Sequence, residues 1–324
     1  MPLEPQMTRL RAGALEATLQ AGEVLAFTSL RHHGEELLVG PGELPPEYLV
    51  HRRWAGIPLM HPWANRLGGD MFALAGVAVT LRSDDPAISR DGNGLAIHGL
   101  RAGEAAWKVR AQGTRGDALL VHAGAPAGPF PFPHTVAVGV ELRADRLSVT
   151  TAVHATGNVH VPVAFGWHPY LRLPGVERPA WRLALPDRRH QVLDGRGIPS
   201  GESIAEAAGE EPLATHTFDD GYDGIAPGSR LAVTGGGRRI AIHLAEGYPA
   251  AQVFAPAAPG VVAPEPMTAP TNALVSGRGL RLVPPGGVFR ATFHLEVDTV
   301  RACEADGPEP LSSTARVDRA SCRA

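Results

Sequence analysis

Five short stretches of the sequence carry polar side chains that interrupt an otherwise apolar pattern and could do chemistry. They are HPWANRLGGD with Asn65 and Arg66, LAIHGLRAG with His98, FGWHPYLRL with His168, TFDDGYDGI with Asp219, Asp220 and Asp223, and APEPMTAPTNAL with Glu265. Histidine titrates near neutral pH, and a fixed carboxylate can remove a proton from a substrate. These residue types therefore favour acid–base work.

Glu265 stands out because it lies between Pro264 and Pro266 in an apolar stretch. Two flanking prolines stiffen the backbone, and we expect them to keep the segment out of a central strand. An acid held this rigidly suggests a positioned group. The alternative is a glutamate on an exposed loop.

The other candidates also have structural interpretations. His168 lies beside Trp167 and Tyr170, so it is either a core histidine with a bonded nitrogen or a group presented at a strand end. His98 could end a strand and bond a backbone carbonyl. Arg66 could be a surface or structural arginine, and the aspartates could form turns, which Asp and Gly favour.

The elements that must position these residues are mainly strands. Residues 135–157 alternate apolar and polar positions on both sides of a short polar turn, which predicts an antiparallel hairpin. Segments 71–82, 230–245 and 287–297 show similar patterns, and 38 glycines and 30 prolines in 324 residues suit many turns. GESIAEAAGEE, residues 201–211, is expected to form a short helix. We expect one all-β domain over residues 1–300, a sandwich of antiparallel sheets with few short helices.

The composition excludes several classes of partner. A net charge of −3 gives no general attraction to nucleic acid, and no apolar run approaches the roughly 18 residues of a membrane span. The start of the chain lacks the apolar segment of a signal peptide. We expect a soluble, cytoplasmic protein. Both cysteines, Cys303 and Cys322, lie in residues 301–324, which are polar and expected to be disordered.

Metal, phosphate-loop and serine-hydrolase chemistry find little support. His32 and His33 would point to opposite faces of a strand, and His154 and His160 lack a neighbouring carboxylate. The glycines at 235–237 join two strands instead of opening a helix. No G-x-S-x-G elbow is present.

Taken together and in order, the five stretches resemble the aldose 1-epimerase (mutarotase) family. The matching blocks are N-R with a following Gly pair, H-G, P-V-A-F-G-W-H-P-Y, D-D-x-Y-x-G and P-E-P-M-T-A-P-x-N-A, spanning about residues 58 to 274. The resemblance implies a β-supersandwich, the galactose mutarotase-like fold, with a sugar bound in a cleft on one sheet. It also implies that no metal or organic cofactor is needed.

The resemblance assigns a role to each candidate. Glu265 would be the general base and His168 the general acid, so His168 is expected at a strand end, fixed by Pro169. Further sugar contacts would come from Arg66, His98, Asn65, Asp219 and Trp63. Asp219 is preferred to Asp220 because it matches the family's spacing. Trp63 or Trp167 would pack on the apolar face of a pyranose, although core packing is the alternative for both.

The implied reaction interconverts the α and β anomers of a monosaccharide by opening and closing its ring. The base removes a proton from the C1 hydroxyl, the acid protonates the ring oxygen, and Arg66 donates to neighbouring hydroxyls. The expected partner is a monosaccharide, bound by a monomer or homodimer.

The substrate stays open among neutral aldohexoses, phosphosugars and acidic sugars. Arg52, Arg53, Arg90 and Arg101 are available to meet a phosphate. Two other functions also stay open. One is a non-catalytic sugar-binding or regulatory module on the same fold, and the other is a lyase or glycosidase on a related sandwich.

Overall fold

The predicted hairpin at residues 135–157 is confirmed and forms the centre of one of two large sheets. In this computed structural model, which describes residues 6–101, 107–122, 128–257 and 260–299, strand β12 (His134–Leu142) pairs antiparallel with β13 (Arg146–Ala155). Val136, Val138 and Val140 are buried on one face of β12, as the alternation requires. The tail predicted to be disordered, with both cysteines, lies outside the described residues.

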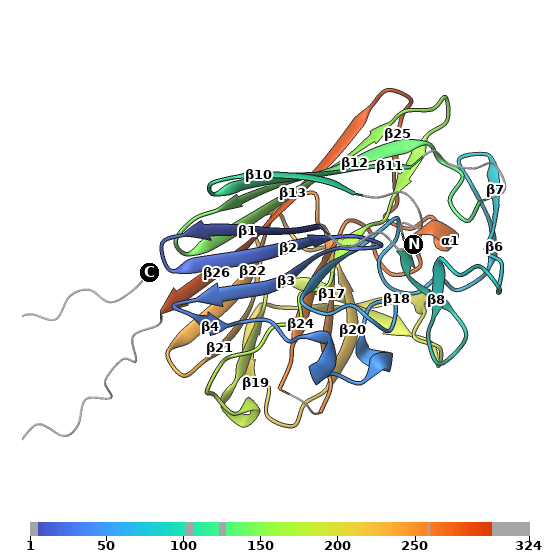
Figure 1. The fold of residues 1–324 in the computed structure, drawn as a ribbon. Coiled ribbons are helices and arrows are strands. Elements are labelled where there is room, and N and C mark those ends of the chain that lie inside the picture. Colours follow the sequence, from blue (N-terminus) through green and yellow to red (C-terminus); the bar gives the residue numbers. More distant parts are fainter. Residues whose placement is uncertain (1–5, 102–106, 123–127, 258–259, 300–324) are drawn as a thin grey trace, which may run out of the picture.

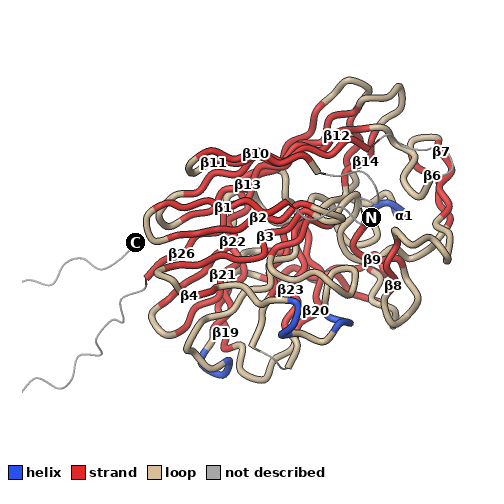
Figure 2. The backbone as a smooth tube through the Cα atoms, in the orientation of Figure 1, coloured by secondary structure: helices blue, strands red, loops and turns tan. Residues whose placement is uncertain are grey.

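The sheet that contains this hairpin has nine strands, and all its paired neighbours are antiparallel (Figures 1 and 2). Its order is β10 (Lys108–Gln112), β11 (Arg115–His122), β12, β13, β26 (Val288–Thr299), β22 (Arg238–Glu246), β21 (Arg230–Gly235), β16 (Arg182–Leu185) and β19 (Gly209–Pro212).

The second sheet has eleven strands; Asp219 and Glu265 lie on it, and His168 directly follows one of its strands. Its order is β1 (Gln6–Ala12), β2 (Leu15–Ala21), β3 (Leu25–His32), β5 (Ile57–Met60), β15 (Gly166–Trp167), β24 (Ala263–Met267), β23 (Ala250–Ala255), β20 (Phe218–Asp223), β17 (Arg188–Leu193) and β18 (Pro199–Glu206), with β4 (Glu35–Glu36) paired to β3.

Smaller elements surround the two sheets. Three two-stranded ribbons are β6 (Met71–Leu74) with β7 (Val77–Thr80), β8 (Ile88–Arg90) with β9 (Ala96–Leu100), and β14 (Val161–Val163) with β25 (Arg281–Val283). The helical turns of the described residues are η1 (Pro41–Glu43), η2 (Pro46–Tyr48), η3 (Arg178–Ala180) and α1 (Ala273–Ser276). The expectation of an all-β sandwich with few short helices is confirmed.

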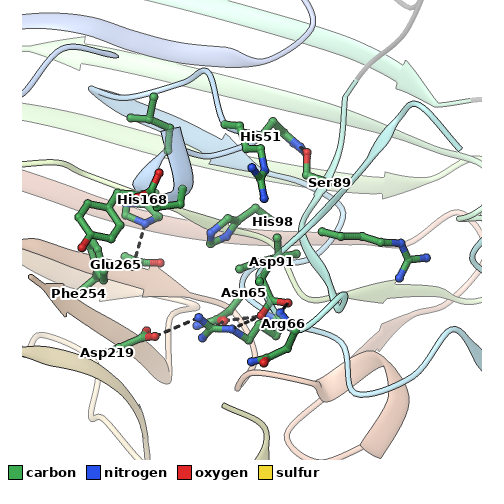
Figure 3. Close-up of a pocket in the computed structure, with 18 residues that line it drawn as sticks. His51, Asn65, Arg66, Ser89, Asp91, His98, His168, Asp219, Phe254 and Glu265 are labelled. Carbon is green, nitrogen blue, oxygen red and sulfur yellow. Dashed lines mark hydrogen bonds and ion pairs between the residues drawn. The ribbon is translucent and has the colours of Figure 1, made fainter. Parts of the chain in front are cut away.

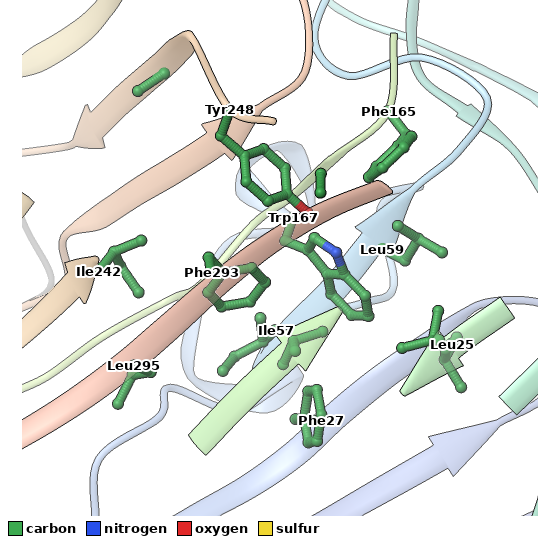
Figure 4. Close-up of a cluster of buried hydrophobic side chains, with 14 of the residues drawn as sticks. Leu25, Phe27, Ile57, Leu59, Phe165, Trp167, Ile242, Tyr248, Phe293 and Leu295 are labelled. Atoms are coloured by element: carbon green, nitrogen blue, oxygen red, sulfur yellow. The ribbon is translucent and has the colours of Figure 1, made fainter. Parts of the chain in front are cut away.

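The hydrophobic core lies between the two sheets (Figure 4). Trp167 from β15 packs against Phe293 from β26 of the opposite sheet, with ring centroids 6.0 Å apart. Its indole Nε1 donates a hydrogen bond to Thr151 Oγ1 at 3.2 Å, so its polar atom is satisfied inside the core. Because successive residues of a strand face opposite sides, a core-facing Trp167 directs His168 to the outer face.

One predicted element is wrong. Residues 201–211 form no helix. They belong mostly to β18 and β19, which are edge strands of the eleven-stranded and the nine-stranded sheet, respectively. Backbone pairing of Ser203 with Gln191 and of Glu210 with Ala184 outweighs the local helix propensity of the Ala- and Glu-rich sequence.

Candidate active site

A polar cleft of about 270 Å³ lies on the outer face of the eleven-stranded sheet (Figure 3). The residues that line it come from the η2 turn, the loop after β5, the β8–β9 ribbon and the strands β20, β23 and β24. They include Asn65, Arg66, His98, His168, Asp219 and Glu265. Six of the seven predicted site residues, from sequence positions two hundred apart, therefore share one cleft.

The centre of the cleft is a contact between an acid and a histidine. Oε1 of Glu265 lies 3.2 Å from Nε2 of His168, and both side chains are almost completely buried. The second carboxylate oxygen of Glu265, Oε2, and Nδ1 of His168 have no hydrogen-bond partner among the described residues. Buried polar atoms normally find partners, so these atoms are available to a ligand.

Glu265 reaches this position from a strand, not from a loop as its two prolines suggested. Strand β24 is central in the sheet, and Glu265 pairs with Gln252 of β23. Pro264 and Pro266 lie two residues apart, so their missing N–H donors fall on the same side of β24. On the side away from β23, β24 meets β15 at a single pair, Gly166 with Met267, so the sheet tolerates missing donors there.

The imidazole of His168 is fixed by its neighbours. It stacks on the ring of Tyr170, with centroids 4.0 Å apart and an interplanar angle of 12°. The Tyr170 hydroxyl donates to the carbonyl of Tyr48 at 2.7 Å and accepts from the amide of Val50 at 3.1 Å. The η2 turn therefore clamps the residue that supports His168.

Burial shifts the proton equilibria of the pair. It raises the pKa of Glu265 well above its usual range, and the nearby Asp219 acts in the same direction while Arg66 opposes it. Burial lowers the pKa of His168 to about 3. Burial therefore favours the uncharged form of both groups, the protonated carboxyl group of Glu265 and the neutral imidazole of His168.

Arg66 forms the floor of the cleft at the other side of Glu265. Its Nε donates to Asp91 at 2.9 Å and its Nη2 to Asp219 at 3.0 Å. Asn65, which precedes it, accepts from the Arg66 backbone amide at 2.8 Å. The guanidinium is thus held in one plane by carboxylates from two distant segments, which leaves a fixed donor array facing the cleft.

Asp219 and Asp220 point to opposite faces of β20. Asp219 lines the cleft and accepts from Nε2 of Gln252 at 2.8 Å as well as from Arg66. Asp220 instead lies 3.3 Å from His190 Nε2 on the other face. The strand period of two explains why adjacent aspartates separate in this way.

His98 lies in the middle of the cleft in a backbone conformation that few residues adopt. Its φ is +62°, and its ring meets that of His168 edge to face with centroids 5.4 Å apart. Gly99 follows because a Cβ there would lie 2.2 Å from the His61 carbonyl oxygen. His51, Arg52 and Asn65 also line the cleft with positive φ. Such strain gathers at functional sites.

Trp63 does not join this group. It is buried in the core at 1% exposure and is absent from the cleft lining, as is Trp167. The suggestion that either tryptophan packs on a sugar ring is wrong, because Trp63 is buried in the core and Trp167 packs between the sheets.

The sequence patterns missed four residues of the site. Gln252 holds Asp219, Asp91 holds Arg66, and Ser89 holds His51 at 2.8 Å from its Nδ1. Asp91, Ser89 and His51 line the cleft. The sequence DGNG at 91–94 signals only a turn, and the other residues lie in unremarkable segments.

Within the described residues, no three His, Cys, Asp or Glu side chains form a group that could hold a metal ion. In the same part of the chain, no helix is long and apolar enough to cross a membrane.

Solved structures of similar fold include mutarotase-like proteins. The Slr1438 protein of Synechocystis sp. PCC 6803 superposes with a TM-score of 0.71 at 22% identity, over 92% of this chain and 97% of that one. A galactose mutarotase-like protein of Clostridium acetobutylicum gives a TM-score of 0.72 at 17% identity, over 92% and 99%. The fold is therefore the galactose mutarotase-like β-sandwich.

The family follows from the sequence itself. The model of the aldose 1-epimerase family matches residues 12–296, and the chain belongs to that family. YihR of Escherichia coli (strain K12), an uncharacterized protein, is 23% identical over 309 residues, covering 90% of this chain and 96% of YihR.

Proposed function

We propose that the protein is an active mutarotase, an isomerase that interconverts the anomers of a free aldohexose or modified hexose, with Glu265 and His168 as its acid–base pair. The observation that carries the proposal is the 3.2 Å contact between Glu265 Oε1 and His168 Nε2 in a cleft that also holds Arg66 and Asp219.

The proton count of the pair suits the reaction. With one proton on the pair, a carboxylic acid beside a neutral imidazole and a carboxylate beside an imidazolium are two tautomers with the same proton count. Moving that proton across the 3.2 Å contact to His168 Nε2 leaves Glu265 as a base and makes His168 an acid. Arg66 favours this form, because its charge lowers the pKa of Glu265.

Ring opening then proceeds without any other reagent. The carboxylate of Glu265 takes the proton of the C1 hydroxyl as the C1–O5 bond breaks. The ring oxygen keeps the bonding electrons and receives the proton of His168, and C1 becomes an aldehyde. Rotation about C1–C2 and the reverse transfers close the ring on the other face, and both groups return to their starting state.

The remaining polar residues would orient the sugar. Arg66 and Asp219 lie beside Glu265, so they would meet the hydroxyl groups on C2 and C3 when C1 is at Glu265. Donors and acceptors that are fixed before binding need no reorganisation in the transition state. His98, whose ring lies next to that of His168, would contact the sugar near the C1–O5 bond.

The test is anomer exchange measured by NMR saturation transfer on glucose, galactose, glucose 6-phosphate and an acidic hexose. Wild-type protein should accelerate exchange on at least one sugar, and Glu265→Gln should lose nearly all of it while still binding. His168→Asn should behave similarly. Binding without acceleration on any of the sugars would favour a non-catalytic module, and cleavage of an oligosaccharide would favour a lyase or glycosidase.

A further inference from the structure

His51 is a buried cleft residue that the acid–base steps do not use. Its side chain lines the cleft at 5% exposure. Its backbone has a left-handed conformation, with φ +51°. Its Nδ1 lies 2.8 Å from Ser89 Oγ, which comes from strand β8. The other ring nitrogen, Nε2, makes no hydrogen bond within the described residues. One nitrogen is thus anchored and the other is available.

The position of His51 relative to the reacting pair determines which part of a sugar it would meet. Figure 3 shows His51 and Ser89 at one end of the cleft, Asp219 and Arg66 at the other, and His98 between them. In a pyranose, C1 is bonded to C2 on one side and to O5 on the other. If C1 lies at Glu265 and O5 at His168, the ring continues past His168 to C5 and its exocyclic C6.

We propose that His51, held by Ser89, is a specificity-determining residue that hydrogen-bonds the oxygen on C6 of a neutral aldohexose. This inference rests on the proposed mutarotase function, because the orientation of the sugar follows from the roles of Glu265 and His168. It assigns the Asp219–Arg66 end to the ring hydroxyls and the His51–Ser89 end to the hydroxymethyl group.

The protonation state of His51 suits a neutral hydroxyl group. Burial lowers the pKa of His51 to about 4, with the nearby Arg101 cation acting in the same direction, so the imidazole is neutral at pH 7. A neutral imidazole offers one donor and one acceptor, which matches a hydroxyl group. The exposed residues Glu47 and Arg52 also line the cleft, as does Arg90, whose Nη1 is paired with Asp70 at 3.0 Å.

The test compares three sugars that differ only at C5. D-glucose carries a hydroxymethyl group, 6-deoxy-D-glucose carries a methyl group, and D-xylose carries hydrogen. His51→Asn is a suitable variant because Asn tolerates the left-handed backbone that this position requires. We expect it to lower kcat/KM for glucose by about tenfold, the usual effect of losing one hydrogen bond, and to leave the other two sugars unchanged. Ser89→Ala should give a smaller loss with the same pattern.

A matched control is His33→Asn. His33 also has a left-handed backbone, with φ +52°, but it is exposed and lies outside the cleft. It should leave all three sugars unaffected. Equal losses on all three sugars in His51→Asn, or no loss on any, would overturn the assignment. A loss shared by glucose and 6-deoxyglucose alone would also overturn it, since His51 would then contact carbon instead of oxygen.

A second readout separates this inference from the proposed function. Saturation-transfer-difference NMR reports which sugar protons touch the protein, whether or not exchange occurs. Glucose should show strong transfer at its C6 protons in wild type and weak transfer in His51→Asn. If wild type binds glucose with this pattern but accelerates no exchange, the mutarotase proposal fails and the His51 contact stands. Anomer exchange without saturation transfer at the C6 protons would support the mutarotase proposal and refute the His51 contact.

Discussion

Asp91, in the cleft lining, holds Arg66 with one carboxylate oxygen and closes a turn with the other. Its Oδ2 accepts from Arg66 Nε at 2.9 Å, and its Oδ1 accepts from the amides of Asn93 and Leu95, each at 2.9 Å. The two side chains are 17% and 11% exposed, so the pair is largely shielded from solvent. Asp91 is therefore a positioning residue for Arg66.

Asp91→Asn is predicted to weaken sugar binding more than it slows the chemistry. An amide keeps an acceptor for the turn but turns an N–H toward the Arg66 donor, so the guanidinium loses one of its two anchors. We expect kcat/KM for the best sugar to fall about tenfold, mainly through a higher KM. The matched control is Asp84→Asn, which removes an exposed Asp–Arg pair with Arg82 and should leave both constants unchanged. A fall in kcat alone would contradict the positioning role.

Tyr170→Phe is predicted to cost stability and spare activity. The ring that stacks on His168 remains, while the bonds from the hydroxyl to Tyr48 and Val50 are lost. The free energy of unfolding should fall by about 1–3 kcal/mol, because buried backbone groups lose a partner. Denaturant unfolding measures this change, and anomer exchange measures kcat. A large loss of kcat with unchanged stability would show instead that the hydroxyl acts in the reaction.

The pH dependence of exchange should show no step near the ordinary pKa of histidine. Burial lowers the pKa of His168 to about 3 and raises the pKa of Glu265, so His168 is not expected to titrate near its ordinary value. After subtraction of spontaneous exchange, kcat/KM should therefore show no inflection at pH 6.5. An inflection near 6.5 would mean that a different ionisation controls the rate.

Glu265→Gln is predicted to raise thermal stability, and to raise it more at neutral than at acidic pH. Because burial raises the pKa of Glu265, the folded state holds this proton to a higher pH than the unfolded chain, which loses it above the ordinary pKa of 4.5. Rising pH therefore favours the unfolded wild type through this group, and glutamine removes that dependence. Thermal unfolding at pH 5 and pH 7 should show a larger Tm gain at pH 7. A gain that shrinks with rising pH would contradict the buried, protonated carboxyl group.

Local periodicity predicted the strands well because alternation is visible within ten residues. The hairpin of β12 and β13 is the clearest case. The segment 201–211 failed because its pairing partners, such as Gln191 for Ser203, decide its structure and are not part of the local pattern. The same holds for Glu265, because Pro264 and Pro266 argued against a central strand. The structure accommodates both prolines because β24 pairs with β15 at only one residue pair.

The cleft itself was predictable only in part. Polar interruptions of the strand pattern drew attention to Arg66, His98, His168, Asp219 and Glu265, the resemblance to a family gave them roles, and the structure brings them together. Trp63 was misassigned because sequence does not say which side of a sheet a tryptophan faces. Asp91 and Gln252 were missed because each acts on a partner, Arg66 or Asp219, that only the tertiary fold brings near.

The strand order of the large sheet has a consequence for the growing chain. Strands β5 and β15, made early and midway, are neighbours in a sheet whose next member is β24, near residue 265. Pairings this distant in sequence form slowly, and they form only after the later strand has been synthesised. A nascent or truncated chain that lacks the last sixty residues has no Glu265 to contact His168, so it cannot form the proposed acid–base pair.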